Sequence, residues 1–274
     1  MNKSEQMYKI IHISDLHFGR ENDVAVNALT GEIKKLDPDV MVISGDLTQR
    51  AKRKEYVLAK KFVDSVACPK VIIPGNHDIP LYNIFQRLTN PFERFDSFFP
   101  EAEYDFYSDD KVNIFGLNSV RARRWKSGKV SEEEMKEIEF SDSLKSEKLR
   151  IATLHHNLVY RSHIRDVDKF LRTNRLIRNF KDNDIDLILF GHDHKKLVRG
   201  NATDKSGPSD LIFIQAGSSI SNRLRGEPNS YNIIFYENNS LTVKSKELRQ
   251  DIFIESADHN FYKKSGKWAQ EANK

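Results

Sequence analysis

Short runs of β-branched and aromatic residues recur along the chain, and most of them end in small polar or charged residues. The runs occupy residues 9–13, 40–43, 71–73, 112–115, 151–154, 187–190 and 211–214. Runs of this length and composition indicate strands that are buried on both faces. They predict sheet strands in the interior of an α/β protein.

Helical patterns separate the early runs. Residues 24–35 and 54–66 place apolar side chains at helical spacing, and Pro38 marks the end of the first segment. The order strand, helix, strand is typical of βαβ units. Residues 231–236 and 241–246 flank an Asn-rich turn and predict a hairpin. We therefore expect a mixed sheet or a sandwich of two sheets, flanked by helices.

Composition narrows the class of protein. Of the 274 residues, 38% are apolar and 31% are charged, and 44 Lys and Arg face 40 Asp and Glu. This balance does not indicate nucleic acid as an obligate partner. The single cysteine, Cys68, excludes an internal disulfide and a Cys-based zinc site. No apolar run approaches the roughly 20 residues of a transmembrane helix, and no signal-peptide core is present, so we expect a cytoplasmic protein.

One domain over residues 1–274 is expected, because no linker or repeat interrupts the chain. Residues 259–274 have little apolar content and predict a loosely attached tail.

Residues able to bind a metal follow five of the predicted strands. In open α/β sheets the carboxyl ends of the strands are where ligands bind. Oxygen and imidazole ligands without thiolate suit Mn, Fe or Zn. Any one of these short motifs also fits a turn or a helix cap, but five in succession favour a metal site. The residues are Asp15, His17, Asp46, Asn76, His77, His155, His192 and His194.

The motifs that contain these residues resemble those of the calcineurin-like metallophosphoesterases. They are Asp-Leu-His at 15–17, Gly-Asp at 45–46, Gly-Asn-His-Asp at 75–78, His-His at 155–156 and Gly-His-Asp-His at 191–194. The longer phrases at 13–19 and 45–48 are most similar to the bacterial cyclic-nucleotide phosphodiesterase branch. The resemblance implies a four-layer α/β/β/α sandwich of two mixed sheets flanked by helices.

The resemblance also implies two divalent metal ions, with Mn expected and Fe or Zn as alternatives. Asp46 would be shared between the two ions. One ion would be held by Asp15, His17, Asp46 and His194, and the other by Asp46, Asn76, His155 and His192. The family often has a proline where Asn157 stands, which leaves a choice between His155 and His156, and we favour His155.

The implied mechanism is attack on phosphorus by a hydroxide that bridges the two metals. His77 matches the catalytic histidine of the family and, as imidazolium, would donate the proton that the leaving oxygen needs. Asn76 stands beside it in the same motif.

Substrate contacts are less specific in the sequence. Arg223 and Arg225 would bind a second phosphate or an anionic head group, or lie on a solvated turn. Arg124 belongs to a basic cluster that would screen a polyanionic substrate or balance a nearby acidic run. The aromatic segment at residues 82–99 predicts core packing or a helix that covers the site, with an apolar slot for an acyl chain as the alternative.

These observations predict a metal-dependent phosphodiesterase with a small-molecule phosphate ester as substrate, a 3′,5′-cyclic nucleotide being the leading candidate. The alternatives are a UDP-2,3-diacylglucosamine pyrophosphatase, which would make peripheral membrane contact, and a nuclease, which the near-neutral charge disfavours. A non-enzymatic scaffold is disfavoured because every ligand position is filled. The sequence does not predict the oligomeric state.

Overall fold

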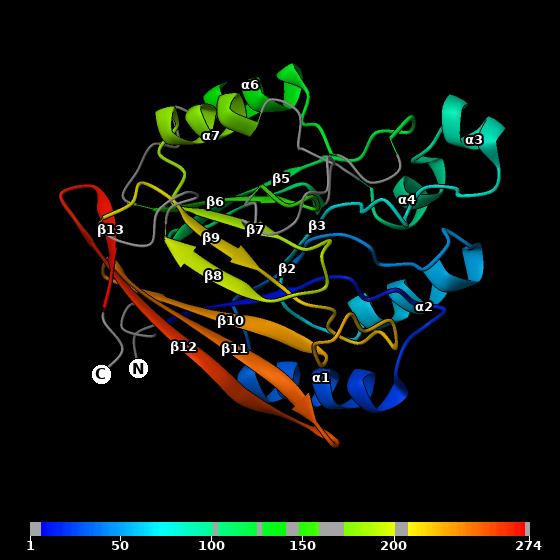
Figure 1. The fold of residues 1–274 in the computed structure, drawn as a ribbon, viewed down its shortest axis with the longest axis horizontal. Coiled ribbons are helices and arrows are strands. Elements are labelled where there is room, and N and C mark those ends of the chain that lie inside the picture. Colours follow the sequence, from blue (N-terminus) through cyan, green and yellow to red (C-terminus); the bar gives the residue numbers. More distant parts are fainter. Residues whose placement is uncertain are drawn as a thin grey trace.

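Two β-sheets stacked face to face form the centre of the molecule (Figure 1). The computed structural model describes residues 7–100, 104–124, 128–140, 148–158, 173–200 and 208–271. Within these residues one sheet has seven strands and the other has six. The first sheet runs in the order β13 (Lys267–Gln270), β12 (Ile252–Lys264), β11 (Ser240–Arg249), β10 (Ser230–Glu237), β1 (Tyr8–Ile13), β2 (Val40–Ile43) and β3 (Lys70–Ile72). The second runs in the order β4 (Phe106–Ser108), β5 (Val112–Leu117), β6 (Leu149–Leu154), β7 (Leu187–Phe190), β9 (Ile212–Gln215) and β8 (Leu197–Gly200).

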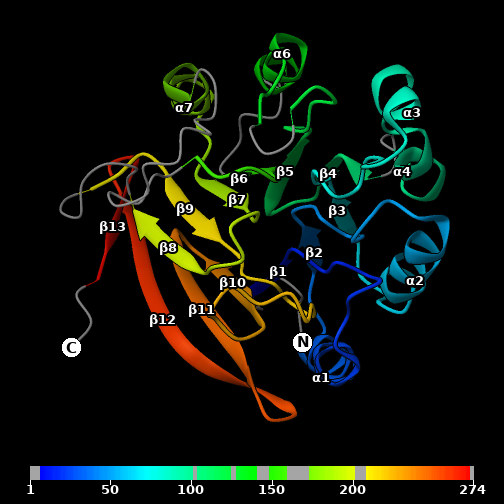
Figure 2. The same ribbon diagram turned by 45° about the vertical axis from the view of Figure 1, so that its right-hand side comes forward.

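Helices cover the outer face of each sheet, which gives four layers (Figures 1 and 2). Helices α1 (Asp23–Leu36) and α2 (Arg53–Asp64) lie against the first sheet, and α6 (Glu132–Phe140) and α7 (Thr173–Asp182) lie against the second. This arrangement confirms the expected α/β/β/α sandwich of two mixed sheets. The single domain over residues 1–274 stays a prediction.

Successive side chains of the inner strands pack on opposite faces that are both covered, which explains why these strands are continuous apolar runs in the sequence. In β1, Ile11 and Ile13 pack toward α1 and α2, while Ile10 packs between the two sheets. Successive side chains of a strand point to opposite faces, and both faces here are covered. The sequence interpretation of strands buried on both sides is therefore confirmed for β1.

Parallel pairing brings the loops that follow the inner strands to a common edge. Strands β1, β2 and β3 are parallel to one another in the first sheet. Strands β5, β6, β7 and β9 are parallel in the second. The C-terminal ends of the strands that precede the candidate ligands therefore gather where the two sheets meet. None of the helices in the described residues is long and apolar enough to span a bilayer.

The C-terminal segment forms part of the first sheet, so the prediction of a loosely attached tail is wrong for residues 259–271. Strand β12 pairs along β11, and β13 pairs with the end of β12. Trp268 is only 2% exposed, and its Nε1 donates to Asp186 Oδ1 at 2.9 Å. The segment is poor in apolar residues, but Phe261 and Trp268 are inserted between the two sheets.

The aromatic segment at 82–99 forms two short helices, α3 (Ile84–Thr89) and α4 (Glu93–Phe98). The expected continuous helical face is interrupted at Asn90, because the following Pro91 excludes helical backbone there. Core packing is confirmed for Phe95 and Phe99, which are buried beside α2. It is wrong for the first half of the segment, where Phe85 is 78% exposed.

Candidate metal centre

The loops after β1 and β2 continue side by side beyond the ends of their strands. Asp15 N donates to Gly45 O at 3.1 Å, and His17 N donates to Asp46 O at 2.9 Å. These bonds keep three candidate ligands on the same side of the sheet edge. The loop after β3 joins them, because His77 N donates to Asp46 Oδ1 at 2.9 Å.

Five of the candidate ligands have left-handed backbone, which is unusual for residues other than glycine. Such conformations each cost on the order of 1–3 kcal/mol and persist only where the surrounding structure holds them. Their occurrence together indicates a site in which the directions of the side chains, and not the local backbone preferences, determine the loop conformations. The residues and their φ angles are Asp15 at 52°, His17 at 50°, Asp46 at 56°, His192 at 77° and His194 at 58°.

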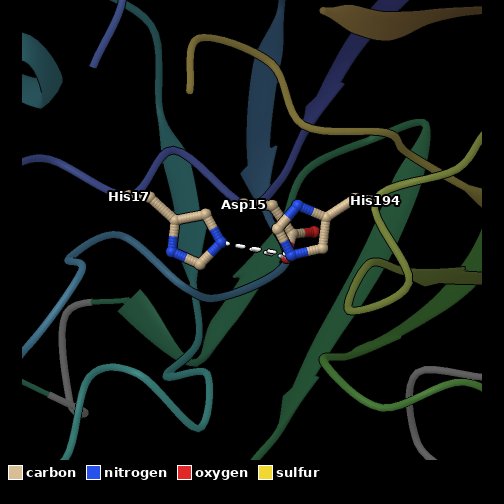
Figure 3. Close-up of side chains that lie close together, drawn as sticks. All are labelled: Asp15, His17 and His194. Atoms are coloured by element: carbon tan, nitrogen blue, oxygen red, sulfur yellow. Dashed lines mark hydrogen bonds and ion pairs between the residues drawn. The ribbon is translucent and has the colours of Figure 1, made fainter. Parts of the chain in front are cut away.

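One group of donor atoms gathers around Asp15 (Figure 3). His194 Nε2 lies 3.5 Å and His17 Nε2 lies 3.7 Å from Asp15 Oδ1. The two imidazole nitrogens are 3.4 Å apart. Asp46 adds a second carboxylate, with Oδ2 at 3.7 Å from His17 Nε2. These four side chains can hold one cation between them.

A second group gathers on the other side of Asp46. Its Oδ1 lies 3.4 Å from His155 Nε2. Asn76 Oδ1 is 3.2 Å from the same nitrogen and 3.1 Å from His192 Nδ1. The two carboxylate oxygens of Asp46 thus face different groups of donors, so Asp46 belongs to both, and Asp15 also lies close to Asp46 and His155.

Bonds between the two sheets orient these side chains. His155 Nδ1 donates to Ser44 O at 2.8 Å, which directs Nε2 toward Asp46. His192 N donates to Asp15 Oδ2 at 3.0 Å. Each bond joins a loop of the second sheet to a loop of the first. The centre therefore depends on how the two sheets are stacked.

The donor set fits divalent cations. Asp15 Oδ1 is buried and has no hydrogen-bond donor among the described residues, although two imidazole nitrogens face it. Such an orphaned carboxylate oxygen indicates a missing positive charge. Imidazoles must be neutral to bind metal. Burial lowers the pKa of His17 well below its usual value and lowers that of His192 to about 3.

Asp46 and His155 behave as a buried ion pair. Burial opposes the charge on Asp46, but the neighbouring His155, His77 and His17 rings hold its pKa well below the usual range. Burial likewise opposes the charge on His155, but Asp46 raises its pKa to about 9. A cation bound to Asp46 would compete with the proton of His155.

Of the two adjacent histidines, His155 is the one that reaches the cluster. His156 Nδ1 instead lies 2.8 Å from Ser119 Oγ, and its backbone N donates to the same oxygen at 3.2 Å. Successive side chains diverge at the end of β6, so only one of the pair can face Asp46. This geometry supports the choice of His155 as the ligand.

Glycine is required where the loops approach most closely. A Cβ on Gly75 would lie 2.1 Å from Asp46 Oδ1, and one on Gly191 would lie 1.9 Å from Ser14 Oγ. Neither contact is compatible with a side chain. The glycines before the candidate ligands thus allow the loops to meet.

His77 lies next to the cluster and opens toward a pocket. Its ring stands edge-on to that of His17, with centroids 4.9 Å apart. Nδ1 donates to Gln49 O at 2.8 Å, so Nε2 is the acceptor that faces Arg223 Nη1 at 2.9 Å. The pocket has a volume of about 730 Å³.

The three candidate arginines are placed differently. Arg223 lines the pocket, and burial with the neighbouring Arg225 lowers its pKa. Burial lowers the pKa of His194, and the charge of Arg225 lowers it further, while Asp15 raises it. Arg124 is not among the described residues that line the pocket. Its backbone carbonyl accepts from Arg87 Nη2 at 3.2 Å, and its contact with substrate stays a prediction.

Sequence reasoning missed Asp78, Gln49 and Ser44 as supporting residues. Asp78 is buried and accepts from backbone and hydroxyl groups of the loops after β2 and β3. Its place directly after His77 in the motif at 75–78 was the available signal. Gln49 and Ser44 orient the histidines through their backbone carbonyls, and because every residue has a backbone carbonyl, no sequence pattern could identify them.

Comparisons with known proteins agree with this geometry. A family model for the calcineurin-like phosphoesterases matches residues 8–196. The "Probable cyclic nucleotide phosphodiesterase" of Ruthia magnifica is 25% identical over 250 residues, which are 87% of this chain and 98% of that protein. The "Probable glycerophosphodiester phosphodiesterase" of Arcobacter nitrofigilis is 27% identical over 160 residues, 54% of this chain and 56% of that one. Among solved structures, a dimetal phosphatase from Danio rerio is similar with a TM-score of 0.60 at 12% identity, covering 91% of this chain and 99% of that one, which shows the fold alone.

Proposed function

The chain belongs to the calcineurin-like phosphoesterase family, and from this premise we propose that it is a phosphodiesterase with a binuclear metal centre. Membership and the phosphodiesterase-named relatives make it a hydrolase of phosphoric esters. The finer proposal concerns the number of metals, their ligands and the substrate.

The observation that carries the binuclear centre is the position of Asp46. One of its oxygens faces His17 and the other faces His155, at 3.7 and 3.4 Å. A carboxylate in this position can bridge two cations, whereas a single-metal site would need only one of the groups. The donors are oxygen and imidazole without thiolate, which suit Mn, Fe or Zn, and we propose manganese with Fe or Zn as alternatives. The proposed ligands are Asp15, His17, Asp46 and His194 for one ion, and Asp46, Asn76, His155 and His192 for the other.

When bound, two divalent ions would supply an activated water and offset negative charge on phosphate oxygens. The chain supplies the remaining parts. Gln49 O holds His77 Nδ1, which directs Nε2 toward the space where a leaving oxygen would lie. Arg223 donates a hydrogen bond to that same nitrogen and can donate to a phosphate oxygen instead when substrate enters. Once Arg223 has left it, Nε2 would take a proton from solvent, and the resulting imidazolium would donate that proton to the leaving oxygen. Asn76 beside it would be both ligand and positioning residue.

The proposed substrate is a small-molecule phosphodiester, with a 3′,5′-cyclic nucleotide as the reference compound. Support comes from the relatives that are named probable cyclic nucleotide phosphodiesterases and match most of the chain. A glycerophosphodiester is the second candidate, because a relative with that name matches 54% of the chain.

The test removes metal from the purified protein, adds back Mn, and measures bound metal and hydrolysis in parallel. Bis-p-nitrophenyl phosphate, cAMP, a glycerophosphodiester and detergent-solubilised UDP-2,3-diacylglucosamine are compared. We expect two ions per chain and hydrolysis that depends on them, with His77→Ala losing rate while it keeps both ions. One ion per chain in wild type would contradict the binuclear centre. Loss of metal in His77→Ala would contradict the role assigned to that ring.

A further inference from the structure

The pocket beside His77 is strongly cationic. Five of its lining side chains are basic and one is acidic. The chain as a whole has a net charge of only +4, because its 44 Lys and Arg are nearly balanced by 40 Asp and Glu, whereas the basic residues of this pocket outnumber its single acidic residue. The basic residues are Arg20, Arg50, Lys52, Lys54 and Arg223.

The acidic residue does not neutralise them. Glu55 is buried, and its Oε2 accepts from the backbone N of Arg50 at 2.8 Å and of Lys52 at 3.2 Å. Its carboxylate is therefore committed to the loop that leads into α2. Among the described residues, none of the five basic side chains forms an ion pair with a carboxylate. Their charges are available to a ligand.

The cationic pocket is continuous with the metal centre. Arg223 contacts His77, and His77 N contacts Asp46. Arg50 also lines the pocket, donates to the Tyr82 hydroxyl and lies 5.1 Å from the centre of that ring. Tyr82 thus holds the Arg50 guanidinium at the pocket. An anionic group bound there would lie next to a phosphodiester at the metals.

The size of the pocket favours a small ligand. Its volume of about 730 Å³ lies within the range of about 300–1,000 Å³ that is typical of small-molecule sites. A nucleic acid would need a basic stripe that continues beyond one pocket. The overall charge does not provide an excess of cations for such a stripe.

We propose that this pocket binds a second phosphoryl group of the substrate. The enzyme then prefers phosphodiesters that carry an additional phosphate over the same esters without it. This inference rests on the proposed phosphodiesterase activity and specifies its substrate class. Arginine and lysine side chains recognise phosphate through charge-assisted hydrogen bonds, and a phosphoryl group relieves the mutual repulsion of the clustered cations.

The test uses two chromogenic substrates that differ in one group. Thymidine 5′-(4-nitrophenyl phosphate) and its 3′-phosphorylated form release the same 4-nitrophenol from the same bond. We expect the 3′-phosphorylated ester to have a KM about tenfold lower, since one phosphate would gain several charge-assisted bonds. Equal KM values would overturn the proposal.

Charge-removing variants locate the effect. In the double variant Lys52→Gln with Lys54→Gln, the ratio of the two KM values should fall to about two. The matched control is Lys34→Gln with Lys35→Gln, which removes two exposed charges from α1, outside the pocket. The control should leave the ratio unchanged. A ratio that falls equally in both double variants would show a general charge effect and overturn the assignment to this pocket.

A binding measurement separates this inference from the proposed activity. Calorimetry with metal-stripped protein compares thymidine 3′,5′-bisphosphate with thymidine 5′-monophosphate. Tighter binding of the bisphosphate, weakened in the Lys52 and Lys54 variant, would support the pocket even if neither ester were hydrolysed. Equal affinities would overturn it even if both were hydrolysed. A single-stranded oligonucleotide that displaces the bisphosphate at much lower concentration would identify a nucleic-acid site instead.

Discussion

Asp78 connects the two loops that carry Asp46 and Asn76, and its substitution should loosen both. Its carboxylate accepts from Thr48 N at 2.7 Å, Thr48 Oγ1 at 2.9 Å, Gly75 N at 2.9 Å and Leu47 N at 3.0 Å. All four donors are buried with it. Replacement by alanine would leave these donors without their acceptor.

The magnitude follows from the number and type of these bonds. A hydrogen bond to a charged group contributes about 1.5–3 kcal/mol, and a buried donor left unpaired costs about 1–3 kcal/mol. The four bonds share one acceptor and do not add. Loss of one partner of a buried charged network costs about 3–5 kcal/mol, which is the destabilisation we expect for Asp78→Ala. Because the same loops position metal ligands, metal affinity should fall about 10–100-fold.

The assay combines urea unfolding of the metal-free protein with a metal titration of the folded protein. Burial and the nearby Asp46 carboxylate raise the pKa of Asp78 to about 6, so both are measured at pH 7.5, where the group is ionised. The control is Asp64→Asn, since Asp64 is exposed and pairs with Lys60 one helical turn away. That variant should change stability by less than about 0.5 kcal/mol.

The reasoning would be refuted by a small effect. If Asp78→Ala unfolds within about 0.5 kcal/mol of wild type, the four donors find other partners and Asp78 does not hold the loops. If stability falls but metal affinity is unchanged, Asp78 supports the fold without positioning Asp46. Asp78→Asn should lie between wild type and alanine, because it keeps one acceptor oxygen.

Three further substitutions and one control test other parts of the structure. Burial lowers the pKa of His12 to about 3. The contribution of His12 to the free energy of unfolding is therefore full above about pH 6.5 and is lost as pH falls toward 3. Between pH 6.5 and 5, the free energy of unfolding of His12→Gln, measured with urea, should fall by about 2 kcal/mol less than that of wild type. Trp268→Ala should cost about 3–5 kcal/mol in the same assay, because the ring is buried between the sheets. Gly75→Ala should lose metal by elemental analysis, because its Cβ would lie 2.1 Å from Asp46 Oδ1. Gly31→Ala, with open space around its Cβ in α1, should keep metal and gain up to about 1 kcal/mol.

A different result would contradict the prediction for each of the three substitutions. An unchanged pH dependence in His12→Gln would mean that the imidazole is protonated in the folded state. A loss below about 1 kcal/mol in Trp268→Ala would mean that β13 detaches readily, as a tail would. Full metal content in Gly75→Ala would mean that the loops after β2 and β3 can separate without cost to the centre.

Much of the fold could be predicted because its inner strands are local patterns. The runs at 40–43 and 187–190 coincide with β2 and β7, since strands buried on both faces need no polar alternation. Strands β8 and β12 were not predicted. Every residue of β8 is only partly buried, and β12 shows no regular alternation of buried and exposed residues. Their pairing partners, not their own composition, make them strands.

The candidate site divides in the same way. Ligand-type residues at strand ends are a local signal, and the structure brings Asp15, His17 and His194 within reach of one another as that signal predicted. Arg124 has a similar local setting after β5, but it is not among the described residues that line the pocket with Arg223. A basic residue near a strand end is therefore not enough to predict a place in the pocket.

The sequence by itself determined the inner strands, the family and the residues able to bind metal, because each depends on residue types at short spacing. Tertiary structure alone decided which atoms meet. His155 is oriented by Ser44, a residue 111 positions away in the other sheet. Trp268 is buried by strands far from it in the chain, and Phe85 is exposed where its spacing suggested core. Burial and ligand direction are set by the stacking of two sheets, and no local pattern encodes that stacking.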